Sequence, residues 1–185
     1  VGADFSGPIS VDAPDVSLAA RIAAFKQIRG VTSVTLGSTT IVSAGDITNS
    51  STVNLMAVDA NTFAQTIYFP TQDSKQTLST LMHQMVEQRN ESKSALPVII
   101  DALAAEKLGL SVGQSFNLQL TRSDSISNGN ITVTVIAEVQ HIPTVEDSTL
   151  QIDSSSTSIA MGILADYQSY ANLYQISFQT PAPTN

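Results

Sequence analysis

Residues 95–143 limit the possible folds more than any other stretch, because strand-like and helix-like patterns follow one another in a fixed order. Residues 96–100 form a short apolar run rich in β-branched side chains, which is typical of a buried strand. Asp101 follows at a position where its carboxylate can cap a helix start. Residues 102–108 are good helix formers, and Gly109 fits the left-handed position just past a helix end.

Two further strands are predicted in the same stretch. Val112 and Gly113 indicate a tight turn, after which residues 116–120 alternate between apolar and polar side chains. The alternation resumes over residues 131–139. The order strand, helix, glycine turn, strand, loop, strand predicts an α+β fold of mixed or antiparallel sheets with packed helices.

The rest of the chain adds helices and strands without a repeated sequence period. A first helix is expected to run through Ile28, with apolar side chains on one face, and to end at Gly30. A second helix over residues 76–89 carries an apolar stripe that is typical of a core face. The other predicted elements are a strand or hairpin over 31–44, a strand over 53–58, a helical turn over 59–69, a strand over 158–163, a helix over 166–173 and a strand over 176–178.

Composition excludes several classes of function. The net charge is −8, and only 13% of residues are charged, about half the typical share. Without clustered cations the chain is not expected to bind nucleic acid, and the acidic balance disfavours steering to an anionic membrane. Cysteine is absent, which excludes disulfide and thiolate chemistry in these residues. No window approaches the roughly 20 apolar residues of a membrane span.

Chemical motifs are sparse, so no catalytic, cofactor or metal site is expected. His83 and His141 show no His-x-x-x-His, Glu-x-x-His or histidine–carboxylate spacing. The acidic residues Glu146, Asp147 and Asp153 lie in a polar loop without the spacing of a calcium loop, so a solvated loop is favoured over calcium binding. No glycine-rich phosphate loop is present.

Four segments together resemble the extracytoplasmic domain of FtsX/MacB-type ABC transporter permeases. Residues 97–120 read Pro-Val-Ile-Ile-Asp, then Lys-Leu-Gly-Leu, Val-Gly and Phe, and residues 133–143 continue from Val-Thr-Val-Ile-Ala-Glu-Val to Ile-Pro. Residues 53–64 are similar to a segment in which the family often has glycine and proline where this chain has Ala57 and Ala60. Met161 to Tyr170 resembles the family's late strand–helix unit.

The resemblance implies a MacB periplasmic-domain-like fold of two lobes. Residues 1–70 and 158–185 would form a discontinuous porter-like lobe, and residues 71–157 an inserted β-rich lobe. It also implies a non-catalytic domain on the extracellular or periplasmic side of a cell membrane. The domain would couple the motion of membrane helices outside these residues to an extracellular substrate or protein. Its implied partners are a second permease copy or homologue and a cytoplasmic ATPase subunit, which would hold the nucleotide site.

Two other functions stay open. One is a free secreted module that binds a ligand or mediates adhesion, and the other is a hydrolase that uses a serine with one histidine. Gly30, Gly109 and Gly113 are predicted to be structural turns, and Gly109 and Gly113 are predicted to occupy backbone positions that disfavour a Cβ.

Overall fold

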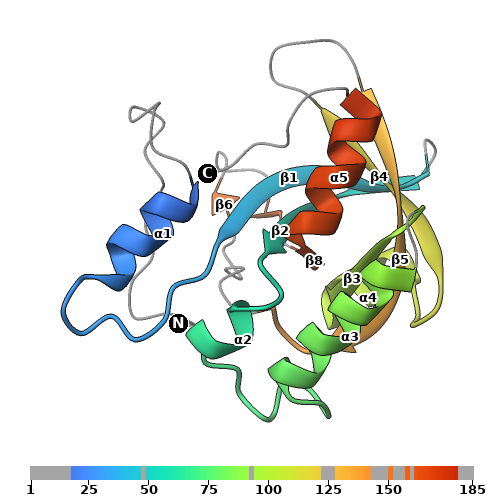
Figure 1. The fold of residues 1–185 in the computed structure, drawn as a ribbon. Coiled ribbons are helices and arrows are strands. Elements are labelled where there is room, and N and C mark those ends of the chain that lie inside the picture. The colour runs from blue at the N-terminus through green and yellow to red at the C-terminus, as the bar shows by residue number, and fades with distance from the viewer. Residues whose placement is uncertain are drawn as a thin grey trace.

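A closed barrel with strand order β1-β2-β8-β3-β5-β4 is the centre of the fold (Figure 1). The computed structural model describes residues 18–46, 49–91, 94–121, 128–142, 150–151, 157–158 and 161–178. The barrel strands are β1 (Gly37–Asp46), β2 (Asn49–Val58), β3 (Leu96–Asp101), β4 (Ser115–Thr121), β5 (Asn128–Val139) and β8 (Met161–Asp166). The other elements are α1 (Leu18–Lys26), α2 (Phe63–Thr66), α3 (Leu78–Glu91), α4 (Ala102–Leu108), α5 (Tyr167–Phe178) and the small pair β6 (Leu150–Gln151) and β7 (Thr157–Ser158).

Alternating apolar side chains fill the barrel. Leu55, Val98 and Ile163 are fully buried inside it, in one continuous apolar cluster. The intervening residues of the same strands, among them Ile99 and Leu164, face outward into a second cluster. Every residue of β3 and β8 is therefore buried, which explains why these two strands are short and almost wholly apolar.

The outward layer is covered mainly by α3. Its predicted stripe is buried against the barrel at Leu78, Leu81, Met82 and Met85. Phe63 of α2 lies in the same cluster and is fully buried. The expectation that the stripe is a core face is confirmed.

The barrel has an internal pseudo-twofold arrangement that sequence periodicity did not reveal. At its centre β3 and β8 pair antiparallel, with Ile100 opposite Ile163. Each of them has a parallel neighbour, β5 beside β3 and β2 beside β8. Each neighbour in turn pairs antiparallel with its own hairpin partner, β4 or β1. The β1–β4 pairing at Ser43–Gln119 and Ala44–Leu118 closes the ring.

Two helices follow the central strands at equivalent places in the two halves. Because β3 and β8 run antiparallel, α4 and α5, which begin where these strands end, lie at opposite ends of the barrel. From α4, Ala104 and Ala105 join the interior cluster. From α5, Tyr170 and Tyr174 join it. Each helix therefore closes one end of the barrel with its own side chains.

The α+β class with mixed pairing is confirmed, but several details differ from the sequence-based expectations. The closed barrel was not predicted. The strands expected to end at residue 44 and to resume at residue 53 are longer than predicted, because β1 and β2 pair as far as Asp46 and Asn49. The strand expected over 176–178 is also wrong, because α5 continues to Phe178. Glu146, Asp147 and Asp153 fall outside the described residues.

The predicted division into two lobes stays a prediction, although the barrel draws its strands from both ranges. Strands β1, β2 and β8 come from the ranges assigned to the discontinuous lobe, and β3, β4 and β5 from the range assigned to the inserted one. The first helix, α1, stands to one side of the barrel (Figure 1). It makes no extensive contact with any other described helix or strand.

Candidate functional site

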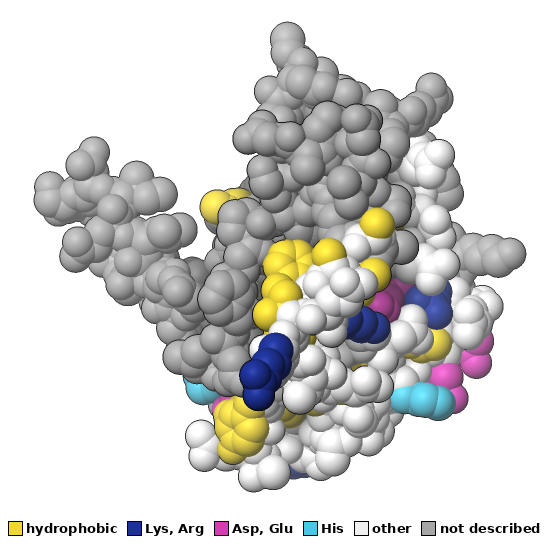
Figure 2. Space-filling model, turned by 60° about the vertical axis from the view of Figure 1, so that its left-hand side comes forward, with side chains coloured by type: hydrophobic (Ala, Val, Ile, Leu, Met, Phe, Trp, Pro, Cys, Tyr) yellow, Lys and Arg dark blue, Asp and Glu magenta, His cyan; other side chains and the backbone are white. Residues whose placement is uncertain are grey.

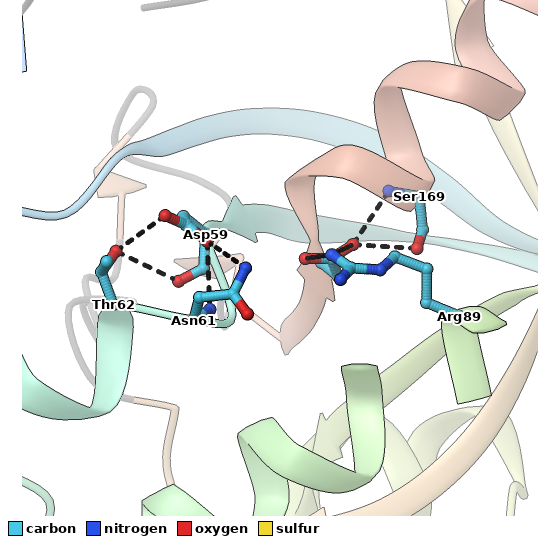
Figure 3. A network of polar contacts seen from close by, with 6 residues as sticks. Asp59, Asn61, Thr62, Arg89 and Ser169 are labelled. Carbon is cyan, nitrogen blue, oxygen red and sulfur yellow. Dashed lines mark hydrogen bonds and ion pairs between the residues drawn. The ribbon is translucent and has the colours of Figure 1, made fainter. Parts of the chain in front are cut away.

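The junction between β8 and α5 joins three elements through one buried carboxylate, that of Asp166. This side chain is 1% exposed and ends β8. One carboxylate oxygen accepts hydrogen bonds from the backbone N–H and the hydroxyl of Ser169, both at 2.9 Å, and so caps the first turn of α5. Nη1 of Arg89, near the end of α3, lies 3.3 Å from the same oxygen (Figure 3).

An equivalent junction lies at the end of β3. Asp101 Oδ1 accepts from the backbone N–H of Ala104 at 2.6 Å, as the sequence predicted for a helix cap. Its other oxygen accepts from the backbone N–H of Gly162, at the start of β8. Asp101 and Asp166 therefore perform the same task in the two halves of the barrel, and each also binds a neighbouring element.

A third aspartate lies at the same edge of the sheet as Asp166. In the parallel β2–β8 pair Val58 is opposite Asp166, so Asp59, the next residue, lies beside that junction (Figure 3). Asp59 accepts from the backbone and side-chain N–H groups of Asn61 at 3.0 and 3.1 Å, and from the Thr62 hydroxyl at 2.9 Å. These contacts hold the turn that leads into α2.

Tyrosines anchor α5 in the barrel. The rings of Tyr170 and Tyr174 lie with centroids 5.7 Å apart and planes inclined by 57°. Burial, with smaller contributions from the neighbouring tyrosines, raises the pKa of Tyr170 well above its ordinary value. Burial also raises the pKa of Tyr167. Tyr170 is thus held in its neutral form within an apolar interior.

Both histidines have carboxylate neighbours, and one of these was visible in the sequence. His83 Nδ1 lies 3.4 Å from Glu87 on the exposed face of α3, an i,i+4 spacing that the sequence analysis wrongly took to be absent. His141 Nδ1 lies 3.2 Å from Asp73 Oδ1. Their separation of 68 residues hid that pair from any local pattern. Among the described residues no three His, Cys, Asp or Glu side chains gather as a metal site would require.

The three predicted turn glycines all have positive φ angles. Gly109 ends α4 with φ 63°, and its N–H bonds to the carbonyls of Ala105 and Glu106. Gly113 has φ 89°, and its N–H donates to the Val135 carbonyl at 2.8 Å, which fixes the turn to β5. Gly30 has φ 94°. No heavy atom lies within 4 Å of a Cβ built at any of the three, so their backbone angle, rather than close packing, favours glycine.

The three aspartates connect neighbouring elements of the fold through hydrogen bonds. Asp59, Asp101 and Asp166 each use their oxygens to accept hydrogen bonds from nearby backbone or side-chain groups. The contacts cluster where strands become helices. The site that they define is a set of hydrogen-bonded junctions, and the one at Asp166 connects α3, β8 and α5.

Comparison with known proteins identifies a similar fold but no family. No protein-family model and no curated protein sequence matches this chain. Among solved structures, the chain is similar to the extracellular domain of the noncanonic ABC-type transporter YknZ from Gram-positive bacteria. The two are 16% identical with a TM-score of 0.51, over 96% of this chain and 76% of that one. The likeness is therefore one of fold.

The described helices include none that combines the length and the apolar character needed to cross a lipid bilayer.

Proposed function

We propose that this chain is the extracellular domain of an ABC transporter permease subunit of the FtsX/MacB type. The observation that carries the proposal is the similarity in fold to an ABC-type transporter's extracellular domain across 96% of the chain. The resemblance in sequence is a second support. Its segments 97–120 and 161–170 include the central strands β3 and β8 and the helices that follow them.

In this proposal the domain is non-catalytic and transmits movement. A domain that transmits movement needs a rigid body and an element that is firmly anchored in it. Helix α5 meets the second requirement, because Asp166 caps its start, Arg89 ties that cap to α3, and Tyr170 and Tyr174 anchor its side in the barrel. Force applied along α5 would therefore reach the barrel and α3 together.

The proposed setting is a membrane complex, with the domain on the extracellular side. Membrane helices beyond this chain would connect it to a cytoplasmic ATPase subunit and place it beside a second permease copy or homologue. The division into lobes at residues 70 and 158 belongs to the same proposal, as do the turn roles of Gly30, Gly109 and Gly113. The transported substrate or extracellular partner is left open.

The first test is the coding sequence on either side of this chain. Apolar spans of 18 or more residues before Val1 and after Asn185 are expected. If neither flank held such a span, the permease assignment would be wrong.

A second test addresses the relay itself in the full-length protein with its ATPase. Spin labels at Gln175 on α5 and Thr132 on β5, both exposed, report the distance between helix and barrel. That distance is expected to stay constant between nucleotide-free and ATP-bound states. A change within the domain would contradict a rigid relay while leaving the permease assignment intact.

The alternative function is a free secreted module that binds a ligand or mediates adhesion. This alternative would use the same fold, and it needs no metal site, of which none is found among the described residues. A signal peptide before the chain and a stop after it would favour this alternative, since a secreted module needs no membrane anchor.

A further inference from the structure

Helix α1 and the residues after it expose apolar side chains that an amphipathic helix normally buries. Phe25, Ile28 and Val31 are 43%, 53% and 37% exposed. They lie on a segment without extensive contact to any other described helix or strand. Together with the exposed Lys26 and Arg29 they form what we call the α1 face. The sequence predicted an apolar face here, but this face does not pack on the barrel.

Charge is segregated on this segment. Residues 16–45, between Asp15 and Asp46, contain Arg21, Lys26 and Arg29 and no acidic residue. Since the whole chain carries −8 and this stretch +3, the remainder carries −11. Figure 2, which brings the α1 side of the molecule forward, shows Lys and Arg side chains beside exposed hydrophobic ones.

The segment is held in place at its C-terminal end. The Ser33 hydroxyl donates to the Gln65 carbonyl at 3.1 Å, and the hydroxyls of Thr35 and Thr62 lie 2.9 Å apart. These contacts attach the segment to α2 and the turn before it.

We propose that the α1 face docks on an anionic phospholipid surface. Phe25 in α1 and Ile28 just after it are each followed directly by a cation, Lys26 and Arg29. Long cationic side chains can lay their stems along acyl chains while their charged ends reach lipid phosphates. Protein interfaces are enriched in arginine and aromatic residues but depleted of lysine, so Lys26 is the residue that favours a lipid surface over a protein partner.

The acidic remainder of the molecule gives this docking an orientation. The separation of charge along the sequence favours contact of the cationic stretch 16–45, rather than of the acidic remainder, with an anionic surface. Net charge alone disfavoured an anionic membrane in the sequence analysis, and the separation of charge reverses that expectation for this face. The inference does not depend on a link to a transporter, because it concerns the isolated chain.

The test is flotation of the 185-residue chain with phosphatidylglycerol vesicles at low salt, with phosphatidylcholine vesicles as the neutral comparison. Binding is expected for the anionic vesicles only. The double variant Lys26→Glu/Arg29→Glu is expected to bind at least about tenfold more weakly, since each cation near such a surface contributes roughly fivefold. Added salt screens the electrostatic part of vesicle binding and leaves the apolar part. Phe25→Ser/Ile28→Ser is expected to weaken that remaining part.

The matched control is Lys107→Glu/Val112→Ser, which changes an exposed cation and an exposed apolar residue elsewhere on the molecule. This variant is expected to bind like the unchanged protein. Equal binding to both vesicle types, no binding at low salt, or equal loss in the control would overturn the proposal. So would self-association in sedimentation velocity that the α1 variants abolish while vesicles stay unbound, because the face would then serve a second copy.

Discussion

Arg89 Nη1 lies 3.3 Å from a carboxylate oxygen of Asp166, although 77 residues separate the two in sequence. The aspartate is buried and the arginine side chain is largely so. In such a pair, removal of one partner leaves the other charge with little solvent, which costs more free energy than the pair itself contributes. The link between α3 and α5 is therefore sensitive to one-sided changes.

We expect Asp166→Ala to lower the free energy of unfolding by about 3 kcal/mol, through loss of the helix cap and of the partner of Arg89. Ser169→Ala keeps its backbone N–H bond to Asp166 and is expected to cost about 1 kcal/mol. Urea unfolding measures both values.

The exposed pair of His83 and Glu87 is the control for this prediction, because pairs of that kind contribute little. Changing Glu87 to alanine should alter stability by less than about 0.5 kcal/mol. Equal losses at Glu87 and Asp166 would show that burial of the junction has no energetic consequence.

At Gly109 the strain comes from the backbone angle alone, since a Cβ would meet no heavy atom within 4 Å. Gly109→Val is expected to cost on the order of 1–3 kcal/mol. Gly109→Asn should cost less, because asparagine adopts left-handed angles more readily than a β-branched residue does. Thermal melts that ranked the two variants equally would contradict this explanation.

Alkaline pH should destabilise the barrel through Tyr170. Its pKa is raised in the folded state, so the unfolded chain loses the phenol proton first. Below about pH 9, Tyr170 makes a constant contribution to the free energy of unfolding. Above the ordinary tyrosine pKa near 10, the free energy of unfolding falls by roughly 1 kcal/mol per pH unit. Urea unfolding between pH 8 and 11.5 measures this slope.

Tyr170→Phe is expected to flatten the alkaline part of that curve. Parallel curves for the unchanged protein and Tyr170→Phe would show that another group controls stability at high pH.

The barrel interior should respond strongly to a cavity. Leu55 is fully buried among the interior side chains. Leu55→Ala is expected to cost about 2–5 kcal/mol. Ile41 lies on the same hairpin but is 60% exposed, so Ile41→Ala should cost less than about 1 kcal/mol. A denaturant titration that found similar losses for both variants would contradict the assignment of Leu55 to the barrel interior and Ile41 to the surface.

Local patterns predicted the parts of this fold whose causes are local. The cap at Asp101, the helix that it begins and the apolar stripe of α3 all follow from residues within a few turns of one another. The strand predicted over residues 176–178 is wrong, because a short apolar run fits a helix as well as a strand. Tyr174 packs in the barrel interior, and the helix continues past it to Phe178.

The parts that could not be predicted depend on long-range pairing. No local pattern around Val53 predicts its alignment with Met161. Likewise, no local pattern around Ser43 predicts the pairing with Gln119 that closes the barrel. The Arg89–Asp166 and Asp73–His141 contacts depend on the same pairing. The predicted apolar face of α1 was correct as a pattern, but a pattern does not specify what covers it.

The position of β8 has a consequence for biosynthesis. This strand lies between β2 and β3, so the sheet before it arrives has a gap that only the short β1–β4 contact spans from the other side. Residues 161–166 are among the last to leave the ribosome in this stretch of chain. Most of the barrel is therefore translated before the strand that completes it. Until then, the edges of β2 and β3 that later pair with β8 remain unpaired and exposed. Demand for chaperones is therefore expected to fall once β8 has left the exit tunnel and can pair with β2 and β3.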